Sequence, residues 1–205
     1  MAFLTAQEKA KIRFAIAEAE ARTCGEIVTV IAHASDSYRY IPTLWAALLA
    51  LSIPGLNFLF GTPLDRALTY QAQVLVFIAA TWLFQQDALK MRLIPKSVRH
   101  RRASLQAREQ FFAQGVHTTP DRAGILIFVS VAEHYVEIIA DEALRAHVSD
   151  DAWQEAIDEF IALLKQGDTT AGFLSAINRC REVLWAHFPA DRENPNTLPN
   201  HLIDV

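Results

Sequence analysis

The stretch that decides the fold is residues 122–144, RAGILIFVSVAEHYVEIIADEAL. Its first part, GILIFVS, is apolar at nearly every position, which is typical of a strand that is covered on both faces. The segment YVEIIAD follows after a turn that is too short for a crossover helix, so the two segments are expected to pair antiparallel. We therefore predict a central strand with an antiparallel neighbour, which ends on two adjacent carboxylates, Asp141 and Glu142.

Helical patterns surround this hairpin. Thr5 and Glu8 have the spacing of a capping box and open a helix that runs to about Arg22. The other predicted elements are a β-branched strand at residues 26–34, a helix that ends at Gly115, and amphipathic helices at residues 150–167 and 169–188. We expect an α/β fold in which a small mixed sheet is sandwiched between helices and the first strand lies parallel to the central one.

The middle of the chain carries two long uncharged stretches. No charged residue lies between Arg39 and Asp65, and a second charge-free interval covers residues 67–86. The first is long enough for a helix of roughly 30 Å, the thickness of a bilayer's hydrocarbon core. Pro54 is expected to kink or split that helix. A buried hairpin in a soluble domain is the alternative, but two such stretches joined by a short turn favour a transmembrane hairpin inserted after the first strand.

A basic segment follows the second stretch. Its cations are Lys90, Arg92, Lys96, Arg99, Arg101 and Arg102, whereas the turn between the two stretches offers only Arg66. The positive-inside bias then places both chain ends in the cytoplasm, at the inner membrane if the source is bacterial. The same cations could bind anionic lipid headgroups, but the simpler interpretation is that they fix the topology.

These features divide the chain into segments. We expect a folded domain built from residues 1–39 and 103–188, a transmembrane hairpin at 40–86, a basic juxtamembrane segment at 87–102, and an extended C-terminal tail at 189–205. The net charge of −4 and the pI near 6.0 give no reason to expect a nucleic-acid partner. Cys24 and Cys180 lie far apart without a CxxC motif, which favours reduced thiols over a disulfide or a zinc site.

Five features of the sequence form a recognisable set: TCGEIVTVI, the hairpin at 122–144, the Trp153 helix, HFP and NTLPN. Together they resemble the TPM domain family, a group that includes thylakoid lumen and photosystem II repair proteins, a receptor auxiliary subunit, and membrane-anchored bacterial members formerly described as a domain of unknown function. The resemblance implies an α/β sandwich. It also implies one of several functions, because some members are acid phosphatases or calcium binders and others are assembly or repair factors.

The sequence departs from the family pattern at two places. Residues 141–144 read DEAL where related bacterial members read DEGI, and residues 196–200 read NTLPN where they read NELPD. Two carboxylate positions of the second motif are therefore neutral in this chain. Any activity that needs those two charges is in doubt.

Two groups of residues are candidates for a site. Asp141 and Glu142 carry the carboxylate oxygens that calcium or magnesium prefers, although a solvated acidic loop is the simpler explanation. Asp121 and Arg122 precede the central strand and are the candidate catalytic residues, because arginine suits a phosphate or a carboxylate. Glu133 lies in the turn at the opposite end of the hairpin and should not share their site.

The sequence therefore favours a membrane-anchored interaction, assembly or repair module whose partners are the lipid bilayer and a membrane protein. A metal-dependent phosphatase of the acid-phosphatase type is the alternative, and a calcium or magnesium sensor domain is a third possibility. The sequence contains no GxSxG, P-loop, GxGxxG or HExxH motif, so no motif supports catalysis.

Overall fold

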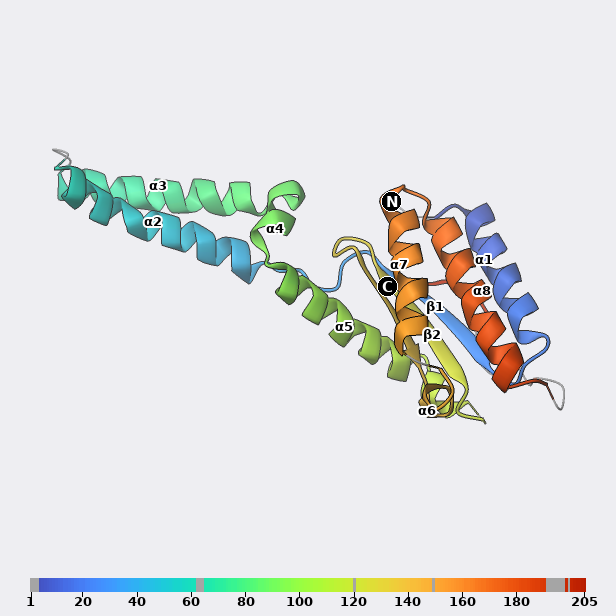
Figure 1. Cartoon of the computed structure of the whole chain (residues 1–205). Coiled ribbons are helices and arrows are strands. Elements are labelled where there is room, and N and C mark those ends of the chain that lie inside the picture. The colour runs from blue at the N-terminus through green and yellow to red at the C-terminus, as the bar shows by residue number, and fades with distance from the viewer. Residues whose placement is uncertain (1–3, 62–64, 120, 149, 191–197, 199) are drawn as a thin grey trace. The chain divides into compact units, whose positions relative to one another are not determined.

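The computed structural model of the chain is shown in Figure 1, and it describes residues 4–61, 65–119, 121–148, 150–190, 198 and 200–205. The chain forms two compact units. The first consists of Met1–Ser35 together with His100–Val205, and the second is Asp36–Arg99. The first unit is thus assembled from two pieces of chain that flank the second unit in the sequence.

The first unit is built on a four-stranded mixed sheet. Its strands are β1 (Glu26–Ala32), β2 (Gly124–Ser130), β3 (Tyr135–Ala140) and β4 (Ile203–Asp204), in the order β3-β2-β1-β4. β1 pairs with β2 in parallel, and β2 pairs with β3 antiparallel, as the sequence predicts. Every residue of β1 and β2 is buried, which is the physical reason for their continuous apolar character.

Helices cover both faces of this sheet. One core is formed with α1 (Ala6–Glu20), α7 (Asp150–Lys165) and α8 (Thr169–His187), and it contains Phe160 and Phe173. The other core is formed with α5 (Lys96–Ala113), which contributes Ala103, Ala107 and Phe111. Two short helices, η1 (Val116–Thr118) and α6 (Glu142–Arg145), flank β2 and β3 in the sequence. This arrangement confirms the predicted α/β fold with a small mixed sheet between helices.

The N-terminal helix begins as its sequence predicts. The Thr5 side chain accepts a hydrogen bond from the backbone N–H of Glu8, and the Glu8 carboxylate accepts one from the backbone N–H of Thr5. The same contact with Thr5 lowers the pKa of Glu8. Because both orphan donors are satisfied, the helix has a fixed start beside the sheet.

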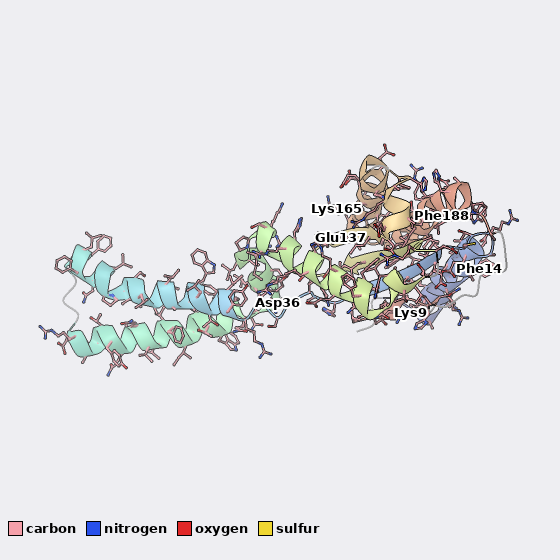
Figure 2. All side chains as sticks on the ribbon, turned by 90° about the horizontal axis from the view of Figure 1, so that it is seen from below. Lys9, Phe14, Asp36, Glu137, Lys165 and Phe188 are labelled. Atoms are coloured by element: carbon pink, nitrogen blue, oxygen red, sulfur yellow. The ribbon has the colours of Figure 1, made fainter. Side chains whose placement is uncertain are left out.

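The second unit contains the two uncharged stretches as helices, α2 (Tyr40–Phe60) and α3 (Arg66–Phe84), followed by the short α4 (Asp87–Leu93). Asn57 Nδ2 donates to Thr69 Oγ1 over 2.9 Å and links α2 to α3. Pro54 lies inside an uninterrupted α2, so the predicted split into two short helices does not occur. In Figure 2 side chains stand outward along both helices, and most of their large apolar residues are exposed.

The end of the C-terminal tail pairs with the sheet, which the sequence did not predict. Ile203 and Asp204 form β4 in parallel with β1, and Leu198 N–H donates to Glu26 Oε2 over 2.7 Å. Asn200 Nδ2 donates to Glu20 Oε2 over 2.6 Å. A two-residue strand has no detectable alternation of apolar and polar residues, which is why the sequence did not reveal it. Residues 191–197 and 199 lie outside the described part of the chain.

Candidate functional site

The acidic end of β3 is positioned by backbone hydrogen bonds. Asp141 N–H donates to the carbonyl of Gly124 over 2.9 Å, which extends the β2–β3 ladder by one pair. Asp141 then caps α6, because its Oδ1 accepts from the N–H of Glu142 over 2.7 Å. Asp141 is buried, with 5% of its surface exposed, whereas the neighbouring Glu142 side chain extends into solvent.

Arg122, two residues before the start of β2, lies close to both carboxylates. Its Nε lies 3.0 Å from Asp141 Oδ2, and its Nη2 lies 3.5 Å from Glu142 Oε2. The Nε–H is not aligned on Oδ2, which is buried and receives no hydrogen bond from the described residues, so the contact is an ion pair without a well-formed hydrogen bond. Arg122 has a φ of 53°, a left-handed conformation that a non-glycine residue adopts only when its surroundings impose it.

These three residues line a cavity of about 680 Å³. Arg108 and Arg145 add two more cations to its wall, and His117 contributes an imidazole. The Nδ1 atom of His117 is buried, and no described residue forms a hydrogen bond with it. Phe111 and Phe112 from α5 provide an apolar part of the lining, and the edge-to-face contact of Phe112 with the His117 ring has a centroid distance of 5.1 Å. The cavity therefore combines three arginines with carboxylates and an aromatic wall.

The sequence predicted part of this set. Of the four candidate residues, Arg122, Asp141 and Glu142 line the cavity together, whereas Asp121 is exposed and is not among its lining residues. Arg108, Arg145 and His117 were not predicted. Arg108 reaches the cavity because α5 packs on the sheet, and His117 reaches it from η1, which follows α5; a single sequence carries no signal for that packing.

Glu133 lies at the other end of the hairpin, as expected, and has a structural role there. Its carboxylate accepts a hydrogen bond from the backbone N–H of Ser35 over 3.0 Å and another from the hydroxyl of Ser130. Glu133 is buried and ties the end of β1 to the end of β2. Glu133 therefore holds Ser35, the residue after which the chain leaves the first unit.

The two candidate metal ligands, Asp141 and Glu142, both line the cavity. Calcium takes about six to eight oxygen ligands, and magnesium needs an octahedral set. Among the described residues no group of three His, Cys, Asp or Glu side chains is placed to hold a metal ion. The position beside Asp141 Oδ2 belongs to the guanidinium of Arg122. Asp150 and Asp151 begin α7, but their side chains lie outside the described residues.

Three further ionisable groups of the first unit have shifted pKa values. Burial raises the pKa of Glu20 to about 8, and the nearby charge of Glu26 acts in the same direction. Burial also raises the pKa of Tyr135 to about 12, with the charge of Glu137 adding to the shift. Cys180 is fully buried on α8, and the loss of solvent raises its thiol pKa to about 12. A thiol in that state is a packing residue rather than a nucleophile.

The comparisons with known proteins agree with this fold. Residues 91–183 match the model of the TPM domain family, a range that contains α5, β2, β3 and the residues of the cavity. Among solved structures, the chain is similar to the NMR structure of BA42 protein from the psychrophilic bacterium Bizionia argentinensis, with a TM-score of 0.62 and 20% identity. That similarity covers 100% of this chain and 97% of the other and shows a common fold. No curated protein matches the chain.

Proposed function

Residues 91–183 of this chain are a TPM domain, and from this premise we propose that the protein is a membrane-anchored TPM module that binds and assembles other membrane proteins. The observation that carries the proposal is the apolar surface of α2 and α3. The two helices have 21 and 19 residues and are long and apolar enough to cross a bilayer. The sheet unit would then be held beside the membrane, where it can reach partners embedded in the same bilayer.

The exposed side chains support the anchor. Phe58 is 90% exposed, Leu75 is 67% exposed and Trp82 is 69% exposed. Burying one such side chain is favourable by about 1.5–3 kcal/mol, so a surface that leaves many of them open requires an apolar surrounding. Hydrocarbon tails supply that surrounding, and the bilayer is therefore the first proposed partner.

The charge distribution supports an orientation. Residues 88–108 contain seven Lys and Arg residues and no Asp or Glu, although the whole chain has 19 cations against 23 acids. The turn between α2 and α3 has Arg66 and Asp65. By the positive-inside rule we propose that α4 and both chain ends face the cytoplasm and that the turn lies on the other side. If the source is bacterial, the membrane is the inner membrane.

The proposal is tested by fractionation and cross-linking. Full-length protein should remain with the membranes after carbonate washing and should need detergent for release. A photo-reactive amino acid at an exposed position of the sheet unit, such as Phe112, should then cross-link to proteins that themselves span the membrane. Release by carbonate would contradict the anchor. Cross-linking no better than that of a variant with the probe at Phe58, on α2, would contradict an interaction surface on the sheet unit.

We also propose a second candidate function, phosphoester binding with hydrolysis, for the cavity at Asp141. The specific observation is the convergence of Arg108, Arg122 and Arg145 on one concave site, because arginine is suited to bind phosphate oxygens. Purified protein is assayed for phosphate release from a generic aryl phosphate, with and without millimolar magnesium or calcium. Activity that falls in Asp141→Asn and in Arg122→Gln would support the candidate. No release in any condition, or release unchanged in both variants, would remove it.

A further inference from the structure

The hairpin unit has a small apolar cluster of its own, at the end opposite to its turn. Tyr38 is fully buried there and packs with Ile41 of α2 and with Ile94, which follows α4. Met91 and Val98 pack against these residues. In Figure 1, α4 lies at that end of α2 and α3. The cluster therefore joins the start of α2 to α4 and to the first turn of α5, which the whole hairpin separates in the chain.

Cations surround this cluster. Each of five basic residues lies within two positions of a member of the cluster, and we call them the basic end: Arg39, Lys90, Arg92, Lys96 and Arg99. Arg39, Arg92 and Lys96 are exposed, and they form no ion pair among the described residues. Packing of the cluster thus brings cations from distant parts of the sequence to one end of the unit.

Few acids oppose these cations. Residues 36–99 contain three acids, and one of them, Asp65, lies at the turn. Asp36 and Asp87 remain for the basic end, and Asp36 Oδ1 accepts a hydrogen bond from Tyr38 N–H over 3.2 Å. Five cations against two acids give this end a net charge of +3, whereas the whole chain carries −4. The next acid along the chain is Glu109, so the excess of positive charge continues beyond the unit.

The same end has side chains that favour the headgroup level of a bilayer. Tyr40 begins α2 and is 53% exposed, and Trp82, two residues before the end of α3, is 69% exposed. Leu89 of α4 is 37% exposed beside Lys90. Aromatic rings and cations next to apolar side chains are typical of a membrane interface. Interfacial aromatic residues and excess positive charge therefore occur together where the two proposed spans end.

We propose that the basic end binds phospholipids with a net negative headgroup, such as phosphatidylglycerol, in preference to zwitterionic ones. The headgroup faces Arg39, Arg92 and Lys96, and the acyl chains follow the apolar surface of α2 and α3. This inference rests on the proposed membrane anchor. It adds a lipid specificity that the positive-inside rule does not require, because that rule concerns only the side on which the cations remain.

The first test measures which lipids surround the full chain. The protein is reconstituted in phosphatidylcholine vesicles with a small share of spin-labelled phosphatidylglycerol or spin-labelled phosphatidylcholine, and electron paramagnetic resonance gives the fraction of each label that the protein immobilises. The anionic label should be enriched about threefold or more. The enrichment should disappear in about 1 M salt, where charges are screened over about 3 Å. Equal immobilisation at low salt, or an enrichment that salt does not change, would overturn the proposal.

Two matched double variants test the position of the site. Arg92→Gln with Lys96→Gln removes two exposed cations of the basic end and should lower the enrichment by about half or more. Lys11→Gln with Arg13→Gln makes the same charge change at exposed positions of α1 and should leave the enrichment unchanged. Both variants should still resist carbonate extraction, because the spans are intact. The same enrichment in the two double variants would contradict a site at the basic end.

A phosphatidylglycerol with a photo-reactive headgroup locates the contact directly. Peptides that carry the cross-linked lipid should come from residues 36–40 and 87–99. Labelling centred on the turn beside Asp65 would contradict the proposal.

Two competitors distinguish the lipid from other anions. Inorganic phosphate at constant ionic strength should not reduce the cross-linking, since a free anion lacks the acyl chains. Displacement by phosphate would mean a site for free anions. Poly-glutamate that binds the chain in detergent, in the absence of any lipid preference, would assign the cations to an acidic protein. Either result would make the proposal wrong.

Failure of this inference is distinguishable from failure of the proposed function. If the chain resists carbonate but shows no preference for the anionic lipid, the anchor stands and the lipid specificity is wrong. If carbonate releases the chain and it still binds to phosphatidylglycerol vesicles through Arg92 and Lys96, the lipid contact stands and the membrane anchor is wrong.

Discussion

The two compact units place the same kinds of side chain in opposite environments. Phe173 in the sheet unit is fully buried, whereas Phe58 in the hairpin unit is 90% exposed. The sheet unit hides its apolar residues in two cores, one on each side of the sheet. The hairpin unit is organised in reverse, because α2 and α3 pack on each other along one side and leave the rest of their apolar surface open. The proposed membrane anchor accounts for this difference, because it places one unit in water and the other in hydrocarbon.

The strongest expected effect comes from truncating one aromatic residue in each unit. Phe173→Ala should lower the free energy of unfolding of the sheet unit by about 3–5 kcal/mol, because it removes a buried ring that contacts Phe160 at a centroid distance of 5.0 Å. Phe58→Ala should leave that free energy unchanged. Guanidinium titration of the full chain in detergent, followed by near-ultraviolet circular dichroism, measures both. Similar losses of unfolding free energy in the two variants would contradict the difference between the two units.

The second largest expected effect comes from introducing an arginine into each unit. Leu75→Arg puts a cation near the middle of α3 and should oppose membrane insertion by about 2.5–3.5 kcal/mol. Leu105→Arg on α5 is the matched control, since Leu105 is 44% exposed in the sheet unit and should tolerate the charge. The fraction of protein that resists carbonate extraction is the measurement. Equal insertion of both variants would mean that Leu75 does not face lipid.

The sheet unit should also respond to pH through Glu20. Its pKa is raised from 4.5 to about 8 in the folded state, mainly by burial, so folding favours the protonated carboxyl. The related stability is fully present below about pH 4.5 and is lost as the pH rises towards and through 8. Glu20→Gln should remove this dependence and stabilise the unit at pH 8 by on the order of 2–3 kcal/mol, with no gain at pH 4.

Denaturant titrations between pH 4 and pH 9 check the Glu20 prediction, and Glu18→Gln on the exposed side of α1 is the control. The hairpin unit should show no comparable change, since its described helices bury no acid. If the free energy of unfolding changes with pH in the same way in Glu20→Gln and in the unmodified chain, another group controls the pH response.

The smallest expected effect uses two helical glycines. A Cβ added at Gly172 would lie 2.2 Å from the Phe160 ring, so Gly172→Ala should destabilise the sheet unit by about 1–3 kcal/mol. A Cβ added at Gly55 of α2 meets nothing within 4 Å, and Gly55→Ala should stabilise that helix by about 0.5–1 kcal/mol. Thermal unfolding of each variant in the same detergent provides the measurement. A destabilising Gly55→Ala would reveal packing on that face of α2.

The sequence was sufficient for the elements whose pattern is local. The Thr5 capping box, the two-sided burial of β2 and the short β2–β3 turn each depend on neighbouring residues, and all three are confirmed. The parallel pairing of β1 with β2 was also predicted correctly, although the hairpin unit separates them in the chain.

The remaining features depend on packing between distant segments. Neither β4 nor the hydrogen bond of Asn200 to Glu20 leaves a periodic signal, because only two residues pair and the partners are 180 positions apart. Arg108 enters the cavity from α5 for the same reason. Of the two predicted outcomes at Pro54, a kink or a split, the split does not occur, because a helix can continue through a proline when only the preceding turn loses a hydrogen bond.

The most direct measurement is the compartment of three points in the full chain. Reporters that are active on only one side of the membrane are fused at the chain start, at the turn beside Asp65 and at the chain end. The account predicts that the two ends report from the cytoplasm and the turn from the opposite side. A turn that reports from the same compartment as both ends would contradict a membrane-spanning hairpin, and with it the contrast between the two units.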